Sequence, residues 1–153
     1  MNRDRFIKLT LYLSIISFIA NILTHIGTYY GITKPFGLHP EVIMLFSLVV
    51  VFCFGTYCDL ILSDYYTNKK DRWKAILRVV PLWLKISLVA MFIYSFYISF
   101  QTNVPVYSRY STRPDLLDVR ILKYFSVSGM FFSLASIIFT NATIKLLDKN
   151  NSS

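Results

Sequence analysis

Two charged side chains fall inside apolar stretches of this sequence, where a charge could do chemistry and where hydrocarbon would penalise it. Asp59 lies in the run 42–62 and Lys85 in the run 79–100. A lone charge at the centre of a bilayer costs about 2.5–3.5 kcal/mol on insertion scales. Asp59 lies near the end of its run and Lys85 near the start of the next run, so both lie close to the inner side of the membrane at similar depth. We therefore predict an intramembrane ion pair between them. Separate snorkelling of each side chain to the interface is the alternative.

Other residue types that carry chemistry are sparse. His25 and His39 alone fall short of the three or four ligands of a usual zinc site. Cys53 and Cys58 stand five residues apart, which turns them to different sides of a helix, and we interpret them as small buried hydrophobes. The sequence shows no paired acids within an apolar run, no Ser–His–Asp set and no glycine-rich phosphate loop. We therefore expect a protein that is not an enzyme and that binds no metal and no cofactor.

The apolar runs that surround these residues are long enough to cross a membrane. Hydrophobic residues make up 55% of the chain, and the mean hydropathy is +0.52. A hydrocarbon core about 30 Å thick needs roughly twenty apolar residues per helix. The runs 9–29, 42–62, 79–100 and 124–144 meet that length. We predict an all-α integral membrane protein, with four transmembrane helices in an up-down-up-down bundle that forms a single membrane domain over residues 1–153.

The first and fourth runs each carry a stripe of small polar residues at steps of three and four, which places each stripe on one helix face. Small side chains let helix backbones approach in lipid, and hydroxyls bond across the contact. The stripes predict helix packing at about +20°, either inside one protomer or between protomers of a homo-oligomer. A hydroxyl-lined pore is the alternative. The stripes consist of Thr10, Ser14, Ser17, Asn21, Thr24 and Thr28, and of Ser126, Gly129, Ser133, Ser136, Thr140 and Thr143.

The distribution of Lys and Arg predicts the orientation. With the N-terminus inside, eleven of the 16 Lys and Arg residues fall on the inner side and five on the outer side. The excess favours both termini in the cytoplasm, and we expect a multi-pass protein of the bacterial inner (plasma) membrane. The net charge of +8 follows largely from this cytoplasmic flank, which attracts anionic lipid. We expect no direct contact with nucleic acid.

Two connections between the runs carry candidate recognition residues. Most of the inner basic loop 63–78 is predicted to belong to an amphipathic helix over 69–80, which Pro81 ends or kinks. One side of that helix presents a partner or lipid contact: Lys70, Lys74 and Arg78. The outer loop 101–121 is the largest extramembrane piece. An outward recognition surface is predicted there, with an interfacial aromatic belt as the alternative: Tyr107, Arg109, Tyr110 and Arg113.

Three features carry a resemblance to a known class. They are the basic leader Asn-Arg-Asp-Arg at 2–5, the spans rich in Phe, Tyr, Ile and Ser, and the end Lys-Leu-Leu-Asp-Lys at 145–149. In architecture the chain resembles small four-span inner-membrane proteins of bacterial conflict systems. Examples are the membrane component of the Kiwa anti-phage system and the immunity proteins against pore-forming colicins.

From that resemblance and the loops, we expect a non-enzymatic, oligomeric sensor or scaffold subunit of an anti-phage defence system. Its outer loop would sense an envelope event, and its inner loop would dock a soluble cytoplasmic partner. The alternatives are an immunity protein against a pore-forming bacteriocin and a pore-forming membrane effector.

Overall fold

The structure, a computed structural model, describes residues 3–32, 37, 40–102 and 114–151. Every regular element in this part of the chain is an α-helix, so the predicted all-helical class is confirmed. The helices are α1 (Arg3–Tyr29), α2 (Pro40–Ser63), α3 (Lys69–Val79), α4 (Leu82–Thr102) and α5 (Pro114–Asn151).

Within the described residues, three helices are long and apolar enough to cross a membrane. These segments are Arg5–Tyr29 in α1, Leu82–Phe100 in α4 and Leu122–Lys149 in α5. Each meets the length of about twenty residues that a hydrocarbon core requires. The chain therefore has the character of a membrane protein.

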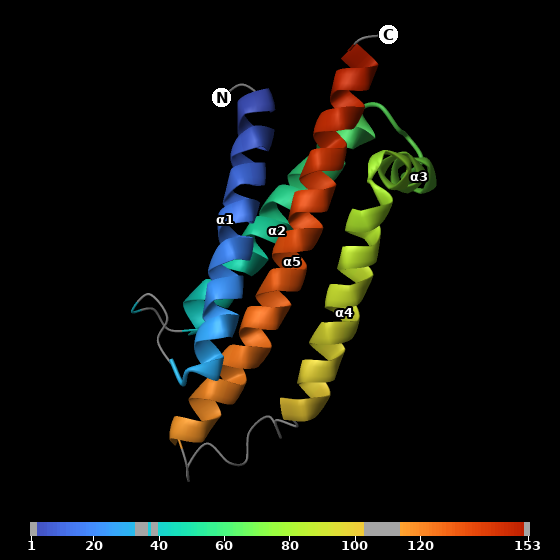
Figure 1. The fold of residues 1–153 in the computed structure, drawn as a ribbon. Coiled ribbons are helices and arrows are strands. Elements are labelled where there is room, and N and C mark those ends of the chain that lie inside the picture. Colours follow the sequence, from blue (N-terminus) through green and yellow to red (C-terminus); the bar gives the residue numbers. More distant parts are fainter. Residues whose placement is uncertain (1–2, 33–36, 38–39, 103–113, 152–153) are drawn as a thin grey trace.

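Helix α5, with 38 residues, is the element on which the bundle is built. All four other helices pack against it, and α2 also packs against α1 and α3. Figure 1 shows α1 and α5 running in opposite directions, so that the two chain ends lie at the same end of the bundle. In the same view α4 descends on the other side of α5 from α1, and α3 lies across the top of α4.

Capping interactions set the ends of α3. The Asn68 side chain accepts a hydrogen bond from the backbone N–H of Lys70 at 3.0 Å, a typical N-cap contact. At the other end Val80 is extended, and the carbonyl of Pro81 accepts from the N–H of Leu84 at 3.1 Å, in the first turn of α4. The predicted amphipathic helix is confirmed and ends at Val79. The following helix begins at Leu82, three residues later than the predicted span 79–100.

An apolar cluster holds α3 against the end of the bundle. It joins the end of α2, the inner face of α3 and the start of α4 to one side of α5. The Trp73 ring also contacts the Phe139 ring, with centroids 5.6 Å apart. Helix α3 is therefore part of the packed bundle. The cluster comprises Leu62, Ile76, Val80, Leu84, Leu134, Ile138, Ala142 and Leu146.

Candidate functional site

The two small-polar stripes face each other across the contact between α1 and α5. All twelve residues are buried, and together they form what we call the polar seam. The hydroxyl oxygens of Ser14 and Ser136 lie 2.8 Å apart, as do those of Ser17 and Ser133. Both bonds join antiparallel helices of one chain. The contact that the sequence left open between one protomer and two is therefore made within the protomer.

Gly129 lies against the Asn21 side chain at the middle of the seam. A Cβ atom at this position would overlap the carboxamide of Asn21, so only glycine leaves that side chain its space. The Asn21 Nδ2 donates to the backbone carbonyl of Ser17 at 2.7 Å and to the Ser47 hydroxyl at 2.8 Å. Among the described residues, the Oδ1 of Asn21 and the hydroxyl of Thr24 lie buried without a hydrogen-bond partner.

Ser47 brings α2 into the seam, a role that the sequence did not predict. Its hydroxyl lies 2.9 Å from that of Ser17 and accepts from Asn21, and the residue is fully buried. The available signal was weak, because one serine in an apolar run shows no periodicity.

A second polar contact, the joint at His25, connects α1, α4 and α5 near the C-terminal end of α1. The Nδ1 of His25 lies 3.0 Å from the hydroxyl of Ser126 on α5, and its Nε2 lies 2.8 Å from the phenol oxygen of Tyr94 on α4. A neutral imidazole suits such a pair, because it offers one donor and one acceptor. Beside this joint the Lys123 ammonium lies 4.2 Å from the centre of the Tyr29 ring, within cation–π range. The sequence did not identify Tyr94.

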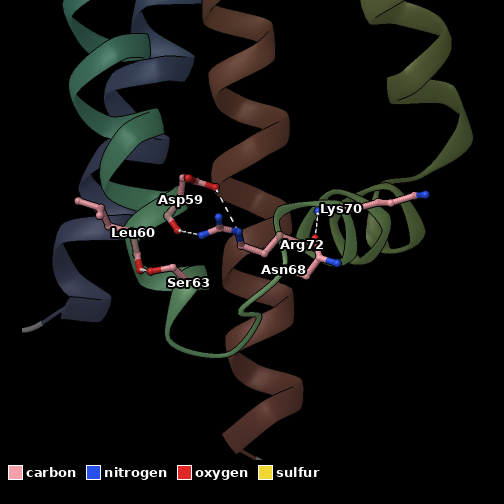
Figure 2. Close-up of polar contacts among 6 residues, drawn as sticks. All are labelled: Asp59, Leu60, Ser63, Asn68, Lys70 and Arg72. Carbon is pink, nitrogen blue, oxygen red and sulfur yellow. Dashed lines mark hydrogen bonds and ion pairs between the residues drawn. The ribbon is translucent and has the colours of Figure 1, made fainter.

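The predicted pair between Asp59 and Lys85 needs correction, because the ion pair that the structure gives Asp59 is with Arg72. The Arg72 Nε lies 3.7 Å from Asp59 Oδ1, and Nη1 donates to the Asp59 backbone carbonyl at 3.2 Å. Figure 2 shows the Arg72 side chain reaching from α3 to the end of α2. The reason is the path of the chain: the turn after Ser63 leads directly into α3, which contacts both α2 and α5, whereas Lys85 stands on α4, which packs on α5.

The predicted inner contact residues Lys70, Lys74 and Arg78 are exposed on α3. Figure 2 shows the Lys70 side chain pointing away from the contact between Asp59 and Arg72. The Lys74 ammonium lies 3.9 Å from Asp71, and both side chains are more than half exposed, so their attraction is weak. A pocket of about 370 Å³ separates this part of α3 from the last turns of α5. Its lining consists of Tyr66, Asp71, Lys74, Ala75, Arg78, Val79, Leu146 and Lys149.

Several predicted residues lie outside the described part of the chain. The outer recognition surface belongs there, and so does His39. The side chain of Cys53 is likewise outside it, while Cys58 is buried. Within the described residues no three His, Cys, Asp or Glu side chains gather as metal ligands would. The outer surface consists of Tyr107, Arg109, Tyr110 and Arg113.

Comparison with known proteins does not assign the chain to a family. No known protein family matches the chain, and neither a curated protein nor a solved structure matches it. The fold and the polar seam define the class: over the residues that the structure describes, the chain is all-helical, with three helices of membrane-crossing length and character.

Proposed function

We propose that this chain is a non-enzymatic scaffold or sensor subunit of a bacterial defence system in the inner membrane. It spans the bilayer four times in an up-down-up-down bundle, with both termini in the cytoplasm. Helix α3 lies at the cytoplasmic surface and holds a soluble partner. The observation that carries this proposal is the anchoring of α3, whose basic side chains are exposed on a helix fixed to the bundle.

The packing of α2 supports a fourth span. It has 24 residues, enough for a bilayer crossing. Ser47 in its second turn bonds to Ser17 and Asn21, near the middle of α1. On the far side Leu45, Phe46 and Val49 are exposed, as lipid-facing residues of a span would be. The bias of eleven inner against five outer Lys and Arg residues supports the orientation.

The anchoring of α3 favours a docking platform over a loose membrane anchor. Ile76 and Val80 are buried in the apolar cluster, and Arg72 holds the helix to the end of α2. A helix held in one orientation presents its charges in a fixed pattern, which reduces the ordering cost of binding a partner. Half-exposed Trp73 and Leu77 suit contact with the interfacial layer of the membrane.

The joint at His25 supports a sensing role for the outer loop. That loop connects the end of α4 to the start of α5, and His25 bonds to a residue on each of these helices. A displacement of either helix end would therefore reach α1 directly. The homo-oligomer that the proposal includes would have to use a surface other than the polar seam, because the seam is filled within one chain.

One alternative draws on the exposed face of α4. The side chains of Trp83, Ile86 and Ile93 are each more than half exposed, and such a face could meet an invading helix inside the bilayer. This observation favours the immunity protein as second candidate. The pore-forming effector is less favoured, because the seam that would line its pore is closed by direct hydroxyl–hydroxyl bonds.

A phage-protection assay with a pull-down tests the proposal. The triple variant Lys70→Ser, Lys74→Ser, Arg78→Ser should lose both the cytoplasmic partner and the protection, at unchanged protein level. The double variant Lys8→Ser, Lys145→Ser is the matched control, since both residues are exposed and belong to the same predicted inner side. Protection against a pore-forming bacteriocin, or ion flux through the purified protein, would instead overturn the proposal.

A further inference from the structure

The hydrogen bonds of the joint at His25 fix which imidazole nitrogen carries the hydrogen. The Ser126 hydroxyl has one hydrogen, which it donates to the backbone carbonyl of Lys123 at 2.9 Å. Its oxygen therefore accepts from Nδ1 of His25, 3.0 Å away. A neutral imidazole with its hydrogen on Nδ1 keeps a lone pair on Nε2. The Tyr94 phenol, 2.8 Å from Nε2, must then donate to that lone pair.

This lone pair is the basic atom of the joint, since an unperturbed imidazole titrates at about pH 6.5. Among the side chains that the structure describes, the titratable groups that face it come from α1, α4 and α5: the phenols of Tyr29 and Tyr94 and the Lys123 ammonium. The Tyr97 phenol acts in turn on Tyr94. Phenols are neutral at this pH. The charge that these groups present to the imidazole is therefore the positive one of Lys123.

A proton on Nε2 would reverse one hydrogen bond and create one repulsion. Nε2 would become a donor, so the Tyr94 oxygen would accept and its own hydrogen would turn toward the Tyr29 phenol, with which it interacts. The imidazolium and the Lys123 ammonium would repel each other at the edge of a low-dielectric region, where charges act more strongly than in water. Lys123 is the group that can leave, because its flexible chain can carry the ammonium out to the interface.

We infer that the joint at His25 is a proton sensor: Nε2 of His25 takes a proton from hydronium, and the Lys123 ammonium leaves the Tyr29 ring. In the neutral state that ammonium lies 4.2 Å from the ring centre, and this contact is lost on acidification. Lys123 is the second residue of the membrane-crossing segment Leu122–Lys149, so the change occurs where α5 enters the bilayer.

The inference rests on the proposed function in one respect, because that function places this end of the bundle on the outer side. His25 lies four residues before the end of α1 at Tyr29, which is about 6 Å along a helix. A proton from the outer compartment has only that short distance to travel. The signal read by the joint is then acidification of the outer compartment.

Nitrogen-15 NMR of histidine in the full chain tests the first half of the inference. The protein is placed in nanodiscs with a purification tag that lacks histidine, and His39→Ala leaves His25 as the single signal. Near pH 7.5 the spectrum should show a neutral imidazole with its hydrogen on Nδ1. Toward pH 5 it should become that of an imidazolium. A hydrogen on Nε2 at the higher pH, or no proton uptake at the lower one, would overturn the inference.

Carbon-13 NMR of lysine tests the second half. The Lys123 signal, identified by its loss in Lys123→Met, should carry a ring-current shift from Tyr29 near pH 7.5. It should lose that shift with the same midpoint as the His25 titration, whereas Lys145, exposed on the same helix, should show no such transition. In His25→Gln, which cannot titrate, the Lys123 signal should stay constant. A Lys123 transition that persists in this variant, or midpoints that differ in the wild type, would contradict the sensor.

Phage protection separates the two proposals. If His25→Gln protects as well as the wild type, the joint is not the sensor and the proposed function stands. If the wild type shows both NMR transitions but gives no protection, the proposed function fails and the proton-sensitive joint stands.

Discussion

Gly129 and Asn21 lie opposite each other in the contact between α1 and α5, and the Asn21 carboxamide occupies the space that a side chain at position 129 would fill. In this place the Asn21 carboxamide bonds to Ser17 of α1 and to Ser47 of α2. The space that Gly129 leaves therefore also affects the contact of α2 with α1. A side chain at position 129 would therefore disturb a residue that bonds to α2 as well as packing against α5.

The first prediction concerns this contact. Gly129→Ala should lower the free energy of unfolding by about 1–3 kcal/mol, the usual cost of overpacking, and Gly129→Leu should abolish stable protein. Thermal unfolding in detergent and protein abundance in the membrane report both effects. Gly55→Ala is the matched control, because a Cβ there meets nothing within 4 Å. Equal effects at positions 55 and 129 would contradict the prediction.

The second prediction concerns the ion pair of Asp59. A double-mutant cycle with Asp59→Asn and Arg72→Met should give a coupling energy of about 1 kcal/mol in the free energy of unfolding. The value is modest because the Asp59 side chain is 42% exposed and solvent screens the pair. The parallel cycle of Asp59→Asn with Lys85→Met should be additive. Coupling to Lys85 that exceeds coupling to Arg72 would restore the pair expected from the sequence.

The third prediction concerns the hydroxyl that joins α2 to the seam. Ser47→Ala removes one of the two interhelical partners of the Ser17 hydroxyl and one of the acceptors of the Asn21 Nδ2. It should cost about 1–2 kcal/mol of stability, since interhelical bonds in membranes contribute about 0.6 kcal/mol each and one N–H of Asn21 loses its acceptor. Ser87→Ala, whose hydroxyl bonds only to its own helix at Trp83, should cost less. The two variants are compared by unfolding in detergent, and identical stabilities would remove Ser47 from the seam.

The fourth prediction concerns topology. A reporter that is active only in the cytoplasm should give signal when fused after Ser153, and a reporter that is active only after export should give signal when inserted near Ser108. The physical reason is the bias of Lys and Arg toward the inner side. Fusions after Tyr65 and Tyr30 add a check on α2: the first should report the cytoplasm and the second the outside. Equal compartments for these two sites would show that α2 does not cross.

Periodicity made the helical class and the faces of α1 and α5 predictable. A stripe with steps of three and four must lie on one side of a helix, and Ser14, Ser17, Ser133 and Ser136 are buried on such a side. What the pattern could not provide was the partner, because the same stripe packs equally well within a chain or between chains. Ser47 and Tyr94 carry no repeat, so their contacts arise only from the tertiary arrangement.

The partner of Asp59 illustrates a different limit. From the sequence, Asp59 was matched with Lys85 because the two residues lie at similar depths in the membrane. Depth does not specify on which side of α5 each helix lies, and it does not show that α3 contacts α2. Arg72 belonged to the segment that the sequence predicted as a surface helix, yet its long side chain reaches back to the end of α2.

The order of the helices along the chain has a consequence for biosynthesis. Helix α5 is the last of the five to be translated, yet it supplies the side chains that meet the polar face of α1. Until it enters the bilayer, the hydroxyls of Ser14 and Ser17 lack those partners in a solvent that cannot hydrogen-bond to them. We therefore expect the nascent protein to remain with its insertion machinery until α5 arrives, and a chain halted before α5 to be an early substrate for membrane proteases.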